Sequence, residues 1–486
     1  MLFRQIFDEK LAQYAYLVGC QKTGEALLID PERDVDRYLA LAESEALTLV
    51  AVAETHIHAD FLSGARELAE RLPVRLYLSD EGEAGWKYEW VKEPKQDGTA
   101  YDAVLLKDGD VFTIGNIEVK AVHTPGHTPE HISFLITDHG GGADAPMGMI
   151  TGDFVFVGDL GRPDLLETAA GVAGAMEPSA RTLYRSVQDF LRLPDYLQVW
   201  PAHGAGSACG KALGAVPGST VGYERRFNAS IDAASRGEAT FVDFILEGQP
   251  EPPLYFARMK RDNKRGARVL GALPQPRRLT TKELGALAGR TDVAVLDTRL
   301  DRSAFMAGHL PGSLYAPLDK TFNTIAGSYV GEDEPIYLIV ETDGVEEAVR
   351  DLVRIGLDTV VGYATPRTLL HYHEEGGVLA SIPEIDVLDM EVLRAQDGVG
   401  VLDVRRLTEY QGVHVAGAQN IAHTRLLVRK PELDRGKVWL VHCRTGARSA
   451  PASALLARFG YDVRYVNGEF ARWVAARGEA VEETVA

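Results

Sequence analysis

Histidine and aspartate residues recur in short clusters through the first half of this 486-residue sequence, each beside an apolar run. The members of these clusters are His56, His58, Asp60, His127, Asp153 and His203. Short apolar runs predict buried strands, and loops at strand ends carry functional groups on a rigid scaffold. Imidazole and carboxylate groups are common ligands of first-row transition metals. The grouping therefore predicts a metal site along one edge of a sheet.

A second candidate centre surrounds Cys443, which follows the apolar run 438–442 and precedes a helix expected to begin near Ser449. A thiol above a helix N-terminus is favoured as the thiolate, which is its nucleophilic form. The backbone amides of such a turn, together with Arg444 and Arg448, would bind an anion such as sulfite or thiosulfate. Cys443 is therefore predicted to be a nucleophile, with Arg444 and Arg448 beside it as anion-binding residues.

The elements that must position the first group alternate short strands with helices. Residues 14–18 and 26–30 predict a strand hairpin, and a helix is expected to follow as far as Ser44. Further strands end close to the histidine and aspartate clusters. The pattern indicates an α/β sandwich of two sheets whose loops build the metal site.

A linker is predicted near residues 273–277, and the sequence beyond it contains one αβ pattern twice. Each copy has an Asp-x-Arg after a strand, a turn with a histidine, and a second strand. The second copy continues with Cys443, whereas the first has Glu341 at the corresponding place. We therefore expect the middle copy to lack cysteine chemistry and to have a structural or docking role.

Four motifs in the first half resemble, in order, those of the metallo-β-lactamase superfamily. They are His56-x-His58-x-Asp60, Pro125-Gly126-His127-Thr128, Thr151-Gly152-Asp153 and Pro201-Ala202-His203. The first motif of that superfamily usually ends with a further histidine that helps to hold a second metal. Phe61 stands at this position, and a phenyl ring cannot ligate a metal. The sequence is instead similar to the persulfide dioxygenase branch, in which two histidines and a carboxylate hold one iron.

This resemblance implies one Fe(II) per chain, held by His56, His127 and Asp153. Such a triad leaves positions open for water, substrate sulfur and oxygen. His58 and Asp60 would hydrogen bond around the ligands and orient them. Plain structural hydrogen bonding by these two residues is the alternative.

The resemblance also implies that Arg162, His203 and Cys209 contact substrate. Arg162 belongs to a Gly-Arg-x-Asp element of the dioxygenase family, and its guanidinium could pair with an anionic group of a thiol carrier. Cys209 is expected near the iron. The alternatives are a turn contact between Arg162 and Asp164 and a buried, inert thiol at Cys209.

Residues 385–482 resemble a rhodanese domain, and the middle copy resembles a degenerate one. Cys443 to Arg448 encloses four residues, the shorter loop associated with sulfur carriers, which argues for a persulfide intermediate at Cys443. The implied architecture is an α/β multidomain protein, with a metallo-β-lactamase αββα sandwich followed by two rhodanese-like α/β domains with parallel sheets. The expected domains are residues 1–255 for the metal domain, 256–276 for a linker, 277–380 for the degenerate rhodanese and 383–482 for the active rhodanese.

Together these resemblances imply a dioxygenase that uses O2 to oxidise the persulfide of a low-molecular-weight thiol to sulfite. A sulfurtransferase would then form thiosulfate through Cys443, in sulfide detoxification. The reverse order, in which Cys443 takes sulfur from thiosulfate and feeds the iron site, is equally open. A glyoxalase II-like metal thioesterase with passenger rhodanese domains and a non-enzymatic sulfur relay are two further interpretations. The carrier thiol also stays open among coenzyme A, glutathione, bacillithiol and cysteine.

Composition and charge limit the partners and the cellular compartment that we expect for this protein. The formal net charge of −19 argues against a nucleic-acid partner. The hydrophobic share of 45% and the charged share of 25% are those of a protein that folds in water. Three cysteines suit a reducing compartment, and no apolar stretch reaches the length of about 18 residues that a membrane span needs. We expect a cytoplasmic enzyme without membrane contact, and a homo-oligomer because both parent families commonly form oligomers.

Overall fold

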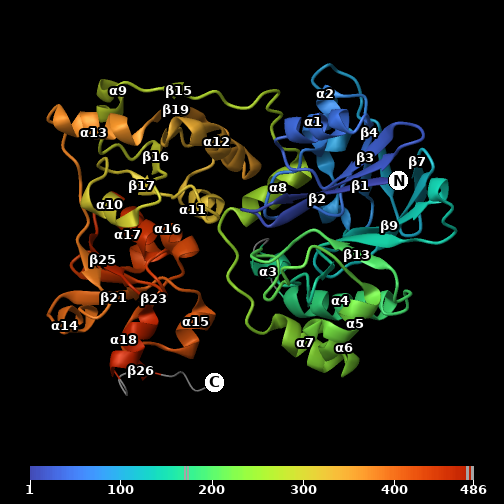
Figure 1. Cartoon of the computed structure of the whole chain (residues 1–486). Coiled ribbons are helices and arrows are strands. Elements are labelled where there is room, and N and C mark those ends of the chain that lie inside the picture. The colour runs from blue at the N-terminus through green and yellow to red at the C-terminus, as the bar shows by residue number, and fades with distance from the viewer. Residues whose placement is uncertain (169–170, 172–173, 478–480, 483–486) are drawn as a thin grey trace. The chain divides into compact units, whose positions relative to one another are not determined.

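The computed structural model describes residues 1–168, 171, 174–477 and 481–482. The chain divides into two compact units (Figure 1). The first comprises residues 1–272 and 354–356, and the second comprises 273–353 and 357–486.

The first unit is built on two six-stranded sheets. One sheet has the order β1-β2-β3-β4-β5-β6 and the other has the order β14-β13-β10-β9-β8-β7. The strands are β1 (Leu2–Asp8), β2 (Gln13–Cys20), β3 (Glu25–Ile29), β4 (Thr48–Ala53), β5 (Arg75–Ser79), β6 (Ala103–Leu106), β7 (Val111–Ile114), β8 (Ile117–His123), β9 (Ile132–Asp138), β10 (Gly148–Gly152), β13 (Gln198–Pro201) and β14 (Ser219–Thr220). The short pair β11 (Val155–Phe156) and β12 (Asp159–Leu160) lies outside both sheets.

Three apolar clusters give the first unit four layers. The central cluster joins Tyr16 and Ile29 of one sheet to Phe134 and Ile150 of the other. A second cluster packs helices α1 and α2 on the first sheet, and a third packs α4 and α7 on the second sheet. The helices of this unit are α1 (Asp36–Ser44), α2 (Ala65–Arg71), α3 (Leu165–Thr168), α4 (Met176–Phe190), α5 (Val221–Phe227), α6 (Ala229–Ser235), α7 (Glu238–Leu246) and α8 (Phe256–Arg265). This order of layers, helix, sheet, sheet and helix, confirms the predicted αββα sandwich.

Helix α8 occupies part of the stretch that was expected to be a linker. Phe256, Met259 and Asn263 of this helix are buried. They recur at helical spacing, which places them on one face. The structure therefore corrects the expectation of a linker over 256–265, because this segment packs as a helix within the first unit.

The second unit contains two parallel five-stranded sheets with one topology. Their orders are β15-β19-β18-β16-β17 and β20-β25-β24-β21-β23. The first sheet is formed by β15 (Arg277–Arg278), β16 (Ala294–Asp297), β17 (Leu314–Tyr315), β18 (Ile336–Ile339) and β19 (Val360–Ala364), with helices α9 (Thr281–Gly285), α10 (Arg302–Ala307), α11 (Phe322–Tyr329), α12 (Val345–Arg354) and α13 (Pro366–Glu374). The second is formed by β20 (Glu384–Asp386), β21 (Val399–Asp403), β23 (Gln419–Asn420), β24 (Val438–His442) and β25 (Asp462–Asn467), with helices α14 (Met390–Arg394), α15 (Leu407–Gly412), α16 (Leu426–Arg429), α17 (Ser449–Arg458) and α18 (Phe470–Arg477). The pair β22 (His414–Val415) and β26 (Val481–Glu482) completes this part.

The shared strand order shows that the sequence pattern repeated after residue 277 is a repeated fold. The Asp-x-Arg motif also has the same local role in both copies. Asp297 accepts hydrogen bonds from the Arg299 guanidinium, and Asp403 accepts them from Arg405. The first pair braces the turn after β16, and the second pair braces the turn after β21.

Candidate functional site

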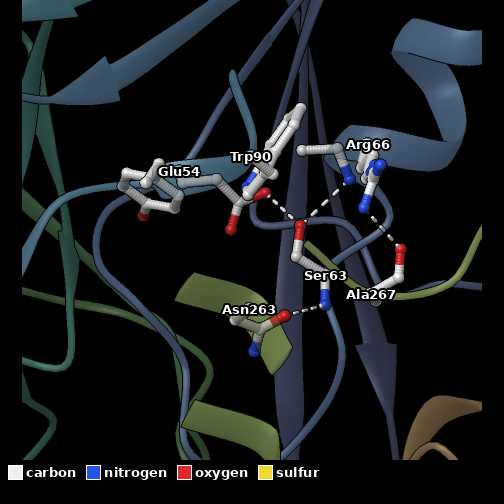
Figure 2. Close-up of a pocket in the computed structure, with 8 residues that line it drawn as sticks. Glu54, Ser63, Arg66, Trp90, Asn263 and Ala267 are labelled. Carbon is white, nitrogen blue, oxygen red and sulfur yellow. Dashed lines mark hydrogen bonds between the residues drawn. The ribbon is translucent and has the colours of Figure 1, made fainter. Parts of the chain in front are cut away.

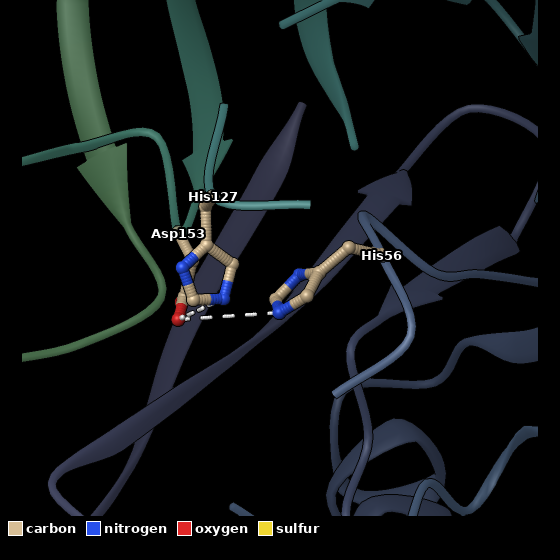
Figure 3. Close-up of side chains that lie close together, drawn as sticks. All are labelled: His56, His127 and Asp153. Atoms are coloured by element: carbon tan, nitrogen blue, oxygen red, sulfur yellow. Dashed lines mark ion pairs between the residues drawn. The ribbon is translucent and has the colours of Figure 1, made fainter. Parts of the chain in front are cut away.

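Three side chains from separate strand ends of the first unit lie together (Figure 3). His56 follows β4, His127 lies in the loop between β8 and β9, and Asp153 follows β10. One ligand atom from each lies within 4.8 Å of the others, and all three side chains are buried. The distance from Asp153 Oδ2 is 3.4 Å to His127 Nε2 and 3.9 Å to His56 Nε2.

Hydrogen bonds fix which nitrogen each histidine presents. His127 Nδ1 lies 3.0 Å from the Arg162 carbonyl oxygen, so it donates there and leaves Nε2 free. His56 Nδ1 lies 2.9 Å from Thr55 Oγ1. Burial holds the pKa of both histidines below the ordinary value. Both rings are therefore neutral, which is the form that binds a metal.

The carboxylate of Asp153 completes the set. Burial by itself would raise its pKa, but the facing imidazole of His203 holds the pKa well below its usual range. Neither carboxylate oxygen has a hydrogen-bond partner among the described residues. The His203 ring lies 3.3 Å from Oδ1, whereas Oδ2 faces the two neutral imidazoles of His127 and His56, where a metal cation would balance the buried charge. Two neutral imidazoles and one carboxylate fit a divalent first-row metal with open coordination positions.

A second group of donors, Asp60, His203 and Cys209, lies beside Asp153. Their ligand atoms also lie within 4.8 Å of one another, and all three are buried. His203 Nε2 is 3.3 Å from both Asp60 Oδ2 and Asp153 Oδ1, while its Nδ1 donates to the Ala12 carbonyl at 3.1 Å. Although burial opposes it, Asp153 and the neighbouring groups raise the pKa of His203, so this ring is protonated between the two carboxylates. Burial also raises the pKa of Cys209 to about 12, which keeps this thiol protonated at neutral pH.

His58 is directed to other partners. Its Nε2 lies 3.2 Å from Asp30 Oδ1 and 3.1 Å from Glu54 Oε2. Despite burial, these carboxylates raise its pKa well above the ordinary value, so His58 is a buried cation with two counter-ions. Phe61 is fully buried and packs on the His58 ring, with centroids 4.4 Å apart. The apolar ring thus offers no ligand atom beside His58.

The loop that carries these residues is fixed from helix α8. A small pocket beside it is lined by Glu54, Ser63 and Asn263, among others (Figure 2). Asn263 Nδ2 donates to the carbonyls of His58 at 2.9 Å and Phe61 at 2.7 Å, and Asn263 Oδ1 accepts from Ser63 N at 2.8 Å. Ser63 Oγ donates to Glu54 Oε1 at 2.6 Å. One side chain of α8 therefore holds three backbone groups of the metal loop.

Arg162, predicted as a substrate contact, is completely buried. Its guanidinium donates two hydrogen bonds to Asp164, at 2.7 and 2.6 Å, and one to the Ala208 carbonyl at 3.1 Å. This is the turn contact that was considered as the alternative. Through its own carbonyl, Arg162 also orients His127. A direct substrate contact by Arg162 gains no support from this arrangement.

Sequence reasoning did not assign a role to His131. Its Nε2 accepts the backbone N–H of Asp153 at 3.0 Å, and its ring stacks on His56 with centroids 5.1 Å apart. Burial lowers its pKa to about 3, so the ring stays neutral and can accept this bond. The residue directly precedes β9, and only the pairing of β9 with β10 reveals its contact with Asp153.

The sulfur-transfer candidate lies in the second unit, between β24 and α17. The Cys443 side chain is only 2% exposed, and its Sγ lies 3.6 Å from Ser449 Oγ. Arg448 is paired with Glu409 at 2.8 Å, and Arg444 is exposed. Within the described ranges, no protein acceptor takes the backbone N–H groups of residues 444–448. These amides are free to bind an anion, as the sequence predicted for this loop.

The middle copy has no thiol at the equivalent place. Strand β18 is followed by Glu341 and the short helix Thr342–Gly344, and these residues are exposed or half-buried. A carboxylate there disfavours binding of an anionic sulfur compound.

Among the described residues, no helix is both long enough and apolar enough to cross a membrane.

Comparison with known proteins agrees with both centres. The model of the metallo-beta-lactamase superfamily matches residues 9–203, and that of the rhodanese-like domain matches residues 389–476. A metallo-beta-lactamase of known structure from Staphylococcus aureus subsp. aureus COL is 40% identical, with a TM-score of 0.66, and the match covers 75% of this chain and 98% of that one.

Two curated relatives match part of the chain. The persulfide dioxygenase ETHE1, mitochondrial, of Bos taurus is 30% identical over 42% of this chain and 68% of that protein. A beta-lactamase hydrolase-like protein of Xylella fastidiosa is 30% identical over 58% of this chain and 64% of that protein. The chain thus spans about two thirds of the length of these relatives. On this basis the chain belongs to the metallo-β-lactamase superfamily and joins its metal-binding sandwich to a C-terminal rhodanese domain.

Proposed function

We propose that the first unit is a persulfide dioxygenase with one ferrous ion, and that the rhodanese domain passes sulfane sulfur through Cys443 to form thiosulfate. In the first reaction a persulfide RSSH, O2 and water give the thiol RSH, sulfite and two protons. In the second, sulfite and a further RSSH give thiosulfate and RSH. The persulfide dioxygenases among the relatives support the first step, and the rhodanese domain supports the second.

The observation that carries the proposal is the donor set around Asp153. His56, His127 and Asp153 converge, whereas His58 is bound to two carboxylates and Phe61 offers no ligand atom. Two histidines and one carboxylate with open positions are typical of oxygen-using ferrous sites. When bound there, iron would supply the redox chemistry that links O2 to the persulfide sulfur.

The residues around this set have separate tasks. Thr55 and the Arg162 carbonyl orient the two imidazoles, and His131 holds the backbone of Asp153. His203 holds a proton at Nε2 between Asp60 and Asp153, where it can hydrogen bond an anionic substrate sulfur or product oxygen. The protonated thiol of Cys209 lies beside it.

At Cys443 the free amides of residues 444–448 would bind the outer sulfur of the cysteine persulfide or the oxygens of sulfite. Arg448 is held by Glu409, so its charge is fixed at the end of this loop. Fusing the two activities would raise the concentration of sulfite near the second site. The proposal also includes a cytoplasmic location and a homo-oligomer, as the cysteine content and the two families indicate.

A two-metal thioesterase is the second candidate, because Asp60, His203 and Cys209 form another donor group next to Asp153. Metal content and substrate use separate the two functions. The chain should be reconstituted anaerobically with ferrous iron. The bound iron per chain, the oxygen uptake with a persulfide and the rate of thioester hydrolysis should then be measured. One iron per chain with persulfide-dependent oxygen uptake is expected. Two metals per chain with thioester hydrolysis and no oxygen uptake would replace the dioxygenase by the hydrolase.

A further inference from the structure

The degenerate middle domain contacts the Cys443 loop directly. Helix α10 of this domain begins with Arg302, and its guanidinium donates to the Thr445 carbonyl oxygen at 3.1 Å. Helix α17, which follows the loop, packs against β17 of the same domain within the second unit (Figure 1). Arg458 of α17 fixes this packing through the Gly312 carbonyl at 2.7 Å and Glu334 at 3.0 Å. The loop is thus bounded on one side by a domain that has no cysteine of its own.

The next carbonyl of the loop is also held. Gly446 O accepts hydrogen bonds from Tyr465 Oη and from Ser449 Oγ, both at 3.2 Å. Gly446 has a φ of +90° and a tightly packed position, since an added Cβ would lie 2.6 Å from Asn467 Oδ1. Only glycine fits this conformation and this space. The two consecutive carbonyls of residues 445 and 446 are therefore fixed in position.

Because the peptide group is planar, fixing these two carbonyl groups also fixes the direction of the N–H groups in the same peptide units. All peptide bonds of the described chain are trans, so each N–H points opposite to the carbonyl of the same peptide unit. Fixing the carbonyls of Thr445 and Gly446 against Arg302 and Tyr465 fixes the N–H groups of Gly446 and Ala447 on the other side of the loop backbone. These are among the amides that no protein acceptor takes in the described ranges.

A second chain of contacts leads from the same helix to the same loop. Ser303 Oγ donates to Glu384 Oε1 at 3.1 Å, and Asn467 Nδ2 donates to the same oxygen at 2.7 Å. The single Tyr465 hydroxyl proton is shared between Asn467 Oδ1 at 3.0 Å and the Gly446 carbonyl at 3.2 Å. Tyr465 in turn holds the Gly446 carbonyl. Two neighbouring residues of α10 are therefore connected to two neighbouring carbonyls of the loop.

The guanidinium of Arg302 lies at the edge of the loop, where its contact is the Thr445 carbonyl. Its side chain is half-buried, and it forms no ion pair in the part of the chain that the structure describes. Arg448 of the loop, by contrast, is neutralised by Glu409. The guanidinium of Arg302 thus lies beside a loop that must bind anionic sulfur.

We infer that Arg302 of the degenerate rhodanese domain is a positioning residue for sulfur transfer at Cys443, because it holds the Thr445 carbonyl so that the loop amides face the sulfur. This inference rests on the proposed sulfurtransferase function. It gives the middle domain a defined task, which is to complete the loop of its neighbour. Arg302 itself forms no bond to sulfur.

The step that Arg302 assists is a pair of balanced sulfur displacements. The Cys443 thiolate attacks the outer sulfur of RSSH, the S–S bond breaks, and the thiolate RS⁻ leaves and takes up a proton. The sulfur lone pair of sulfite then attacks the outer sulfur of the Cys443 persulfide, and the Cys443 thiolate is the leaving group. No net oxidation occurs, and the loop amides stabilise the negative charge on the outer sulfur.

The test compares Arg302→Met and Arg302→Lys with the parent in the full-length chain. Arg290→Met is the matched control, since Arg290 is an exposed arginine of the same domain whose ion pair among the described residues is with Asp292. Thiosulfate and cyanide serve as probes, and kcat and KM are measured separately. The rate of Cys443 alkylation by iodoacetamide at neutral pH is followed by peptide mass spectrometry.

Loss of one hydrogen bond from a charged group predicts a fall of about tenfold in kcat/KM for Arg302→Met, with a similar fall in the alkylation rate. Arg302→Lys should restore most of both values, and Arg290→Met should match the parent. Arg302→Met with the parent's kcat/KM and alkylation rate would overturn the inference. If the parent itself transfers no sulfur, the proposed function fails, and the alkylation rates alone decide the role of Arg302. Should Arg302→Met unfold, as judged by its thermal midpoint, Arg302→Gln replaces it in the same comparison.

Discussion

Replacing Asn263 by alanine should loosen the metal loop from a distance. Asn263 is buried in α8 and makes three hydrogen bonds with backbone groups of His58, Phe61 and Ser63, at 2.9, 2.7 and 2.8 Å. Each buried hydrogen bond contributes about 1 kcal/mol. The variant should therefore lower the free energy of opening of this loop by about 3 kcal/mol, since the three backbone groups lose their partners together.

Hydrogen exchange followed by mass spectrometry measures this opening locally, which avoids treating a multidomain chain as a two-state system. A loss of about 3 kcal/mol corresponds to a fall of about a hundredfold in protection for peptides that cover residues 56–63. Lys264→Ala is the control, because Lys264 lies on the same helix and forms a surface ion pair with Glu89. Protection in Asn263→Ala that stays within about twofold of the parent would refute the argument that α8 fixes the loop.

Three further outcomes follow from the site. Asp153→Asn should lose metal retention, measured as bound iron after gel filtration, because the only carboxylate of the triad is gone; iron bound as in the parent would contradict the assigned ligands. Burial lowers the pKa of Lys260 to about 8, below the unfolded value of about 10.4, so the unfolded state binds more protons between these values and stability should rise with pH there. The thermal midpoint of the parent should rise with pH over this range, and that of Lys260→Met should not. The same change of midpoint with pH in both proteins would contradict the prediction. Ser449→Ala removes a donor to the Gly446 carbonyl and a neighbour of Cys443 Sγ, and should lower the alkylation rate of Cys443 severalfold without loss of iron; an unchanged alkylation rate would refute this.

Much of the architecture could be predicted from local patterns. Apolar runs that end in His56, His127 or Asp153 predicted strands with polar residues at one sheet edge, and the structure brings these three together. The repeated motif around Asp297 and Asp403 predicted two copies of one fold, and both sheets have the same strand order. These features depend on short segments whose periodicity is visible in the chain.

Features that depend on distant pairs could not be predicted. The sequence places His58 in a metal motif, but its partner Asp30 lies 28 residues away, directly after β3, and this pairing turns the ring to the carboxylates. The contact of Asn263 with Phe61 spans 202 residues. The helical spacing of the apolar residues Phe256 and Met259 was a usable sign of helix α8, which the high charge of this segment obscured.

The role of Arg302 was hidden for a different reason. A degenerate copy without its cysteine gives no local sign of a task, and the contact with Thr445 exists only because α17 packs against β17. In the inferred role, the copy that lacks a cysteine still supports the loop of its neighbour.

The most direct test of the central claim measures the products of persulfide oxidation in the parent and in Cys443→Ser. Both proteins should be loaded with ferrous iron without oxygen, supplied with a low-molecular-weight persulfide and O2, and assayed separately for sulfite and thiosulfate. The account predicts equal oxygen uptake, with thiosulfate from the parent and sulfite alone from Cys443→Ser. Oxygen uptake by neither protein, or the same thiosulfate yield from both, would contradict a dioxygenase that feeds sulfur transfer at Cys443.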